Sequence, residues 1–416
     1  MLCVLSAPVL PAERSAEIAA LKRTVAAQSL QIQELVQRLS VLEKRTTASE
    51  PVGQPRLAPD KPGVSRPAPS PYDGGFGTRT EDNAFSLKAN GFLQARFTAS
   101  RPAAGTDVDN FDVALARFAL SGNAFGPDVH YFMQYEATTF SNSNRVGMLD
   151  WWMAWNSSPN LQLQAGRFIL PYSRQFYTHP GDLLFPDLSE ADYAFDLPRA
   201  VGAHASGASD WLHYDAAIVN SVRSLDGGGQ QNASGSLGAL VRLEADILEP
   251  YGYNESSPKP VEEAQLSVGV AAAYNPVDEA SGFQNLMPGD RAHNLTVDLG
   301  FREDRLSFQA ARYFRTTDLA LAGAPDNDDR GYYAQVGYYL VPERWELALR
   351  TSGVDFDAAN NPAVAGDVTA YTVGLNRYFR GHDLKLQADF SILERETFAG
   401  LDSTDRRLRI QSQLRF

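Results

Sequence analysis

The chain of 416 residues has a single cysteine, Cys3, which excludes an intrachain disulfide framework and every multi-cysteine zinc or iron–sulfur site. It also lacks an excess of positive charge. It contains 37 Lys and Arg residues and 50 Asp and Glu residues, and the resulting net charge of −13 argues against a nucleic-acid-binding protein. No window holds 18 uncharged apolar residues, so a membrane protein built of helices is excluded. Aromatic residues are abundant, with 17 Tyr and 22 Phe, a profile that fits an outer-membrane β-barrel.

Catalytic motifs are missing as well. The six histidines fall in different predicted strands and loops, and the sequence contains neither GxSxG nor HExxH. A hydrolase of the Ser/His/Asp type needs those groups close together. We therefore predict no enzyme, no catalytic residue, no cofactor and no metal site.

The first 80 residues divide into three segments. Residues 1–12 are a short apolar run that resembles the tail of a secretory signal, with a disordered leader as the alternative. Within residues 13–45, apolar side chains recur at alternating steps of three and four, with Gln28 in the one polar position. This heptad pattern predicts a coiled coil that joins copies of the chain, although a helix packed on its own domain shows the same stripe. Residues 46–80 contain seven prolines and few apolar residues, which predicts an extended spacer.

From residue 81 to residue 416 the period changes to two. In the last segment Leu408, Ile410 and Leu414 alternate with Arg407, Arg409 and Arg415. Sixteen candidate strands follow this pattern, at about 85–100, 111–125, 128–140, 146–157, 160–170, 199–209, 211–221, 233–249, 263–275, 292–302, 305–317, 329–341, 343–356, 366–380, 382–395 and 403–416. A soluble sandwich could show the same alternation. The lengths of the connections between the strands distinguish a sandwich from a membrane barrel.

Short and long connections alternate along the chain. The tight ones are Gly126-Pro127, Ser158-Pro159, Asp210, Glu303-Asp304, Pro342 and Gly381, and the eighth connection, 250–262, is the exception to this order. Short periplasmic turns that alternate with long outer loops are typical of a bacterial outer-membrane barrel. The sequence thus predicts an all-β fold, a 16-stranded antiparallel transmembrane β-barrel preceded by an α-helical coiled coil. Aromatic clusters near strand ends are expected to form its girdles: Tyr131, Tyr135, Trp151, Trp152, Trp155, Tyr332, Tyr333, Tyr338, Tyr339, Tyr378 and Phe379.

Several of these strands resemble the phosphate-selective porins O and P. The likeness covers about 85–416. Its most specific part is Gly331–Asp355, which reads GYYAQVGYYLVPERWELALRTSGVD. Four other segments also carry it: Phe111–Glu136, Leu163–Tyr172, Pro198–Gly207 and Val373–Phe390. The resemblance implies a homotrimer in the outer membrane of a Gram-negative-type cell, with the coiled coil in the periplasm. It also implies recognition of the terminal Phe416 by the barrel-assembly machinery. The a and d residues of the heptads, in contrast, favour two strands.

The alternation of side chains predicts which polar residues face the lumen. They are Lys88, Arg96, Arg117, Arg242, Arg350, Lys385, Arg407 and Arg409. Such residues can contact a permeating solute or form ion-pair networks that brace the wall.

The third long loop, about 171–198, is long enough to fold into the lumen and form the constriction. It contributes Arg174 together with the carboxylates Asp182, Asp187, Glu190 and Asp192. Carboxylates at a constriction raise the barrier to phosphate, whereas the lumen arginines keep anion passage possible.

The sequence therefore predicts an outer-membrane porin for passive diffusion of small hydrophilic solutes or ions, with a possible preference for anions or phosphate. Expected partners are outer-membrane lipid, other copies of the chain, and small anions or other small solutes. The alternative is a structural envelope protein that links the outer membrane to the periplasm or cell wall through its coiled coil, with a non-selective or cation-preferring pore.

Overall fold

The computed structural model describes residues 74–103, 105–138, 145–220, 235–277, 287–320, 326–357, 367–396 and 402–416. All of them belong to one compact unit, Lys61–Phe416. The leader and the coiled coil predicted for residues 1–12 and 13–45, and the spacer up to residue 73, lie outside the described residues.

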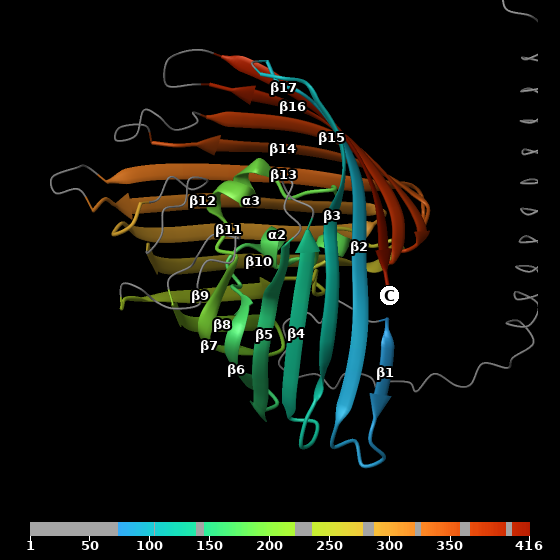
Figure 1. The fold of residues 1–416 in the computed structure, drawn as a ribbon, viewed down its shortest axis with the longest axis vertical. Helices are drawn as coiled ribbons and strands as arrows, with labels where there is room; N and C mark the ends of the chain where they lie inside the picture. The colour runs from blue at the N-terminus through green and yellow to red at the C-terminus, as the bar shows by residue number, and fades with distance from the viewer. Residues whose placement is uncertain are drawn as a thin grey trace, which may run out of the picture. The chain divides into compact units, whose positions relative to one another are not determined.

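Sixteen long strands form one closed antiparallel sheet (Figure 1). They are β2 (Ser86–Arg101), β3 (Val108–Asn123), β4 (Val129–Thr138), β5 (Arg145–Ser158), β6 (Leu161–Ile169), β7 (Arg199–Ala208), β8 (Leu212–Asn220), β9 (Leu237–Asp246), β10 (Val261–Pro276), β11 (Arg291–Asp304), β12 (Leu306–Asp318), β13 (Asn327–Val341), β14 (Trp345–Asp355), β15 (Val368–Arg380), β16 (Leu384–Arg395) and β17 (Ser403–Arg415). Each pairs with its neighbours in the chain, and β17 pairs with β2 to close the ring. The predicted 16-stranded antiparallel barrel is confirmed.

The tight connections lie together at one end of the barrel, which we call the tight-turn end. Several contain residues with positive φ, including Gly126 (127°) and Gly381 (50°), a conformation that glycine adopts without steric cost. The connection 247–260, between β9 and β10, is the long one at this end, as the sequence indicated.

Successive side chains alternate between the lumen and the outer surface. On β16, Lys385, Gln387 and Asp389 face inward and are buried, whereas Leu386 and Phe390 face outward and are exposed. An apolar outer surface and a polar interior are the reverse of a water-soluble protein and suit a barrel surrounded by lipid.

The predicted aromatic girdle is correct for only part of its residues. Because neighbours in a strand point to opposite faces, each adjacent pair is divided between the two surfaces. Tyr338 and Phe379 lie outside and are exposed, but Tyr339 and Tyr378 lie inside and are buried. Trp152 likewise stacks on Phe132 in the interior.

A further short strand, β1 (Phe76–Arg79), lies beside the end of the chain (Figure 1). It pairs with the Ser86–Ala89 part of β2, next to the stretch of β2 that pairs with β17. Between the two partners, Gly91 and Phe416 exchange backbone hydrogen bonds of 2.9 and 3.0 Å. The sheet thus starts at Phe76, inside the segment predicted as spacer and before the predicted boundary at residue 81.

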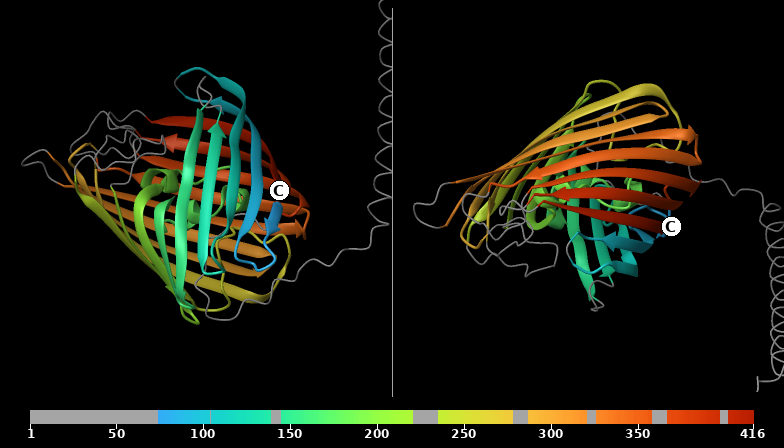
Figure 2. Two further views of the ribbon diagram at one scale, coloured as in Figure 1. Left: turned by 60° about the horizontal axis from the view of Figure 1, so that its bottom comes forward. Right: turned by 90° about the horizontal axis from the view of Figure 1, so that it is seen from above.

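Loop 171–198, between β6 and β7, folds into the barrel. Its helical turns α2 (Arg174–Tyr177), η1 (Pro180–Asp182) and α3 (Glu190–Phe195) lie inside the ring of strands (Figures 1 and 2). Ser173 and Ser189 begin α2 and α3, since each hydroxyl accepts a backbone N–H of the first turn. No helix in the described ranges is long and apolar enough to cross a membrane.

One side of the lumen is filled by apolar packing between this loop and the wall. Phe195 of α3 stacks on Tyr313 of β12, with ring centres 5.6 Å apart. Gly331 of β13 permits this approach, because a Cβ there would lie 2.6 Å from the Phe195 ring. The loop is therefore packed on the wall like a core element.

Candidate functional site

The inward loop meets a group of arginines on the opposite wall. The carboxylate of Asp187 lies 2.9 Å from Arg96 of β2 and 3.2 Å from Arg409 of β17. Arg350 of β14 donates to the backbone carbonyl of Asp187 at 2.9 Å, and Arg409 also pairs with Asp389 of β16. Three wall strands that are far apart in the sequence thus converge on one loop residue.

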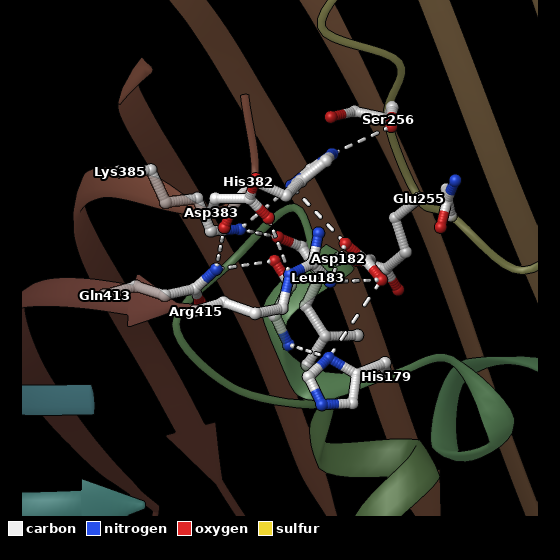
Figure 3. Close-up of polar contacts among 12 residues, drawn as sticks. His179, Asp182, Leu183, Glu255, Ser256, His382, Asp383, Lys385, Gln413 and Arg415 are labelled. Atoms are coloured by element: carbon white, nitrogen blue, oxygen red, sulfur yellow. Dashed lines mark hydrogen bonds and ion pairs between the residues drawn. The ribbon is translucent and has the colours of Figure 1, made fainter. Parts of the chain in front are cut away.

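Two more ion pairs join the loop to β17. Glu190 accepts from Arg407 at 2.9 Å, and Asp182 accepts from Arg415 at 2.9 Å (Figure 3). Lys385 of β16, in the same region, donates to the carbonyl of Leu183 at 2.8 Å. The stretch from Asp182 to Glu190 is consequently attached to the wall along its length.

A second charged cluster lies on the other side of the loop. Arg174 of α2 pairs with Asp298 of β11 at 2.6 Å and with Glu244 of β9 at 3.1 Å. Arg242 of β9 pairs with the same two carboxylates. All four side chains are buried, so the two positive and two negative charges neutralise one another within the protein.

Asp192 occupies the interior of the loop. Its carboxylate accepts from the hydroxyls of Ser173 and Tyr313, the latter at 2.7 Å. Burial raises the pKa of Asp192 to about 7, since these two neutral donors compensate only part of the desolvation of a charged carboxylate.

The other loop carboxylates differ according to their neighbours. Burial tends to raise the pKa of Asp187, but Arg96 and Arg409 outweigh it and hold that pKa below its usual range. Burial raises the pKa of Asp182 in spite of the neighbouring Arg415. Asp187 therefore contributes a full negative charge to the loop surface.

Exposure separates the predicted pore residues into two groups. Arg96, Asp187, Glu190 and Arg407 keep part of their side chains accessible, with exposed fractions of 14%, 22%, 22% and 25%. Lys88 is half-buried on β2, whereas Arg117 of β3 pairs with Glu136 of β4 at 2.6 Å and has only 8% of its side chain exposed. The accessible face lies between loop 171–198 and the wall formed by β17 and β2.

The remaining predicted residues are covered. Arg174, Asp192, Arg242, Lys385 and Arg409 are almost completely buried, and Asp182 and Arg350 nearly so. Because the folded loop packs over them, these residues lie apart from the accessible face, and their contact with a permeating solute stays a prediction. The alternation of a strand gives the face on which a side chain lies, but it does not show that a folded loop packs over that face.

Sequence reasoning missed a second inward segment. The connection 247–260 turns into the lumen from the tight-turn end, where Tyr251, Glu255 and Ser256 are buried. Arg174 stacks over the rings of Tyr251 and Tyr253 and donates to the carbonyl of Gly252 at 3.0 Å. The unusual length of this connection was the one signal of its role.

The arrangement suits a solute passage with accessible charges of both signs. Within the described ranges, no group of His, Cys, Asp and Glu side chains could hold a metal ion. The structure is accordingly a barrel narrowed by an ion-paired loop.

Solved structures of several outer-membrane channels are similar to this barrel. The outer-membrane channel DcaP of Acinetobacter baumannii has a TM-score of 0.57 and 12% identity over 82% of this chain and 99% of its own. Salmonella typhi OmpF has a TM-score of 0.56 and 14% identity over 82% and 100%. The anion-selective porin from Comamonas acidovorans has a TM-score of 0.55 and 12% identity over 79% and 100%. At these identities the likeness shows the fold alone.

Sequence comparison identifies the family. Among curated proteins no sequence is significantly similar to this chain. The family model described as phosphate-selective porin O and P, however, matches residues 87–416, which is nearly the whole barrel. Together with the closed barrel, its apolar outer surface and its narrowed lumen, this match places the chain in the phosphate-selective porin O and P family, as a non-enzymatic outer-membrane porin that forms a diffusion channel.

Proposed function

We propose that this porin passes small hydrophilic solutes with a modest preference for anions and without strict selection for phosphate. One observation carries the proposal: the Asp187 carboxylate already lies between Arg96 and Arg409. A phosphate ion that approaches these arginines has to compete with an anion attached to the loop.

The charge balance around Asp187 supports a weak preference. Four arginines outnumber three carboxylates by one; the set is Arg96, Arg350, Arg407, Arg409, Asp187, Glu190 and Asp389. A single surplus positive charge attracts anions in general, but it gives little discrimination between them. The similarity to a porin described as anion-selective agrees with this sign of preference.

Single-channel recording in planar bilayers tests the proposal. Reversal potentials in a potassium chloride gradient are expected to show a small preference for chloride, and added phosphate to reduce the current weakly. A preference for potassium would refute the proposed sign. A strong block by dilute phosphate would show that phosphate displaces Asp187 and that the channel is phosphate-selective.

We infer that the channel is a homotrimer. The family resemblance supports this number, and one similar solved structure is the outer membrane protein OmpT of Vibrio cholerae in a trimer form. Chemical cross-linking of the purified protein tests it, with a variant that lacks residues 13–45 as the comparison. A deletion variant that remains trimeric would show that the barrel alone sets the number of subunits.

A further inference from the structure

The two inward segments meet through Glu255, a buried residue of the connection 247–260. One carboxylate oxygen of Glu255 accepts the backbone N–H of Leu184 at 2.6 Å, and the other accepts the side-chain amide of Gln175 at 2.7 Å. The backbone N–H of Glu255 donates to the carbonyl of Asp182 at 3.1 Å. One residue from the tight-turn end thus contacts the loop at three separate points.

The connection is itself fixed to the wall on both sides of Glu255. The hydroxyl of Ser256 lies 3.3 Å from that of Tyr339 and 3.2 Å from that of Tyr378, and the Ser256 carbonyl lies 3.1 Å from His382 (Figure 3). On the other side, Arg302 donates to the carbonyl of Asn254 at 2.6 Å. Glu255 is therefore held by β11, β13, β15 and the turn before β16, and it transmits that support to the loop.

The residues fixed by Glu255 are the ones next to the accessible arginines. Asp182 pairs with Arg415, and the backbone carbonyl of Leu184 accepts from Asn376. Asp187, three residues after Leu184, pairs with Arg96. If this stretch moves away from β16 and β17, the width of the passage beside Asp187 changes.

We propose that the connection 247–260 is a second element of the constriction and that Glu255 is its positioning residue, which holds loop 171–198 in place and thereby sets the size of the opening. This role is independent of the ion preference proposed above, because Glu255 is buried away from the accessible face. The proposal rests on the hydrogen bonds that join the two segments.

Two variants of Glu255 and a matched control test the proposal. Glu255→Ala removes both carboxylate acceptors, whereas Glu255→Gln keeps one acceptor and replaces the other by a donor. Glu262→Ala removes an exposed carboxylate at the start of β10, next to the same connection. The folded fraction of each variant is measured first, from the change in gel mobility on heating.

The readouts are single-channel conductance and the rate at which a membrane-impermeant thiol reagent labels Leu184→Cys, with Cys3 replaced by Ser. Glu255→Ala is expected to show higher conductance, noisier open-channel current and labelling about tenfold or more faster, because it loses two buried hydrogen bonds to the loop. Glu255→Gln is expected to lie between Glu255→Ala and wild type, and Glu262→Ala to match wild type.

Folded Glu255→Ala protein with wild-type conductance and labelling overturns the proposal, as does an equal change in Glu262→Ala. If Glu255→Ala does not fold, Glu255→Gln decides, and wild-type behaviour in both readouts overturns the proposal. Reversal potentials recorded in the same membranes are expected to be unchanged, which separates this result from a failure of the proposed anion preference.

Discussion

Asp187 and Arg96 join the inward loop to the first long strand of the barrel. Their side chains lie 2.9 Å apart, and a second nitrogen of Arg96 donates to the carbonyl of Pro186 at 2.7 Å. The arginine therefore binds both the charge and the backbone of the loop. This places a negative charge of the protein where a permeating anion would be most strongly attracted, and several predictions of ion preference depend on it.

Replacing Asp187 by Asn is expected to raise the anion-to-cation permeability ratio. The amide keeps the shape of the side chain but removes its charge, so Arg96 and Arg409 become available to permeating anions. A change of about fivefold corresponds to roughly 1 kcal/mol, the interaction of two charges 4 Å apart in water. Reversal potentials measure it, with Asp304→Asn at an exposed turn as the control. An unchanged ratio contradicts the role given to Asp187.

The pair Arg407–Glu190 distinguishes a charge effect from a bracing effect. Both side chains are partly exposed, so loss of the ion pair is expected to change stability by less than about 1 kcal/mol. Arg407→Gln should lower the preference for anions, and Glu190→Gln should raise it. If both variants shift the reversal potential in the same direction, the pair acts through the position of the loop and not through the charges of its side chains.

Removal of Arg174 is expected to destabilise the barrel. Arg174→Ala leaves Asp298 and Glu244 buried with Arg242 as their remaining partner, and breaking a buried pair costs about 3–5 kcal/mol. Arg305→Ala, which removes an exposed arginine 3.9 Å from Asp304, is the matched control and should cost less than about 1 kcal/mol. Urea unfolding followed by tryptophan fluorescence gives both values. An equal loss of unfolding free energy in the two variants would argue against a stabilising buried network around Arg174.

The stability of the loop should depend on pH through Asp192. Its pKa is raised to about 7, against about 4 in an unfolded chain. The stabilisation is therefore complete below about pH 4 and is lost as the pH rises toward 7. Open-channel noise in wild type is expected to increase between pH 5 and pH 8, whereas Asp192→Asn should show no such step. A step that persists in the variant would assign the titration to another group.

The barrel was predictable because the same alternation of polar and apolar residues repeats in every strand. Period-two alternation gives the face of each residue, and the interior positions of Lys385 and Arg409 agree with it. The length of loop 171–198 predicted that it could fold into the lumen. These are local properties of the chain, and they do not depend on knowing which strands are neighbours across the lumen.

The contacts of the site were not predictable in the same way. Asp187 meets Arg96 and Arg409 because two short capped helices turn the loop across the lumen, and that path is set by packing against distant strands. The burial of Arg242 and Lys385 likewise depends on what covers them. The sequence marked the connection between β9 and β10, predicted at 250–262, as unusual, but it contained no sign that Glu255 would reach the loop.

The short strand β1 has a consequence for how copies of this protein behave at high concentration. Without it, the Ser86–Ala89 part of β2 would present unpaired backbone groups beside Phe416, and such an edge is a template for pairing with another chain. With β1 in place, the exposed edge is four residues long and ends in Arg79, features that oppose edge-to-edge aggregation. The segment that leads into the barrel thus also protects its seam from unwanted self-assembly.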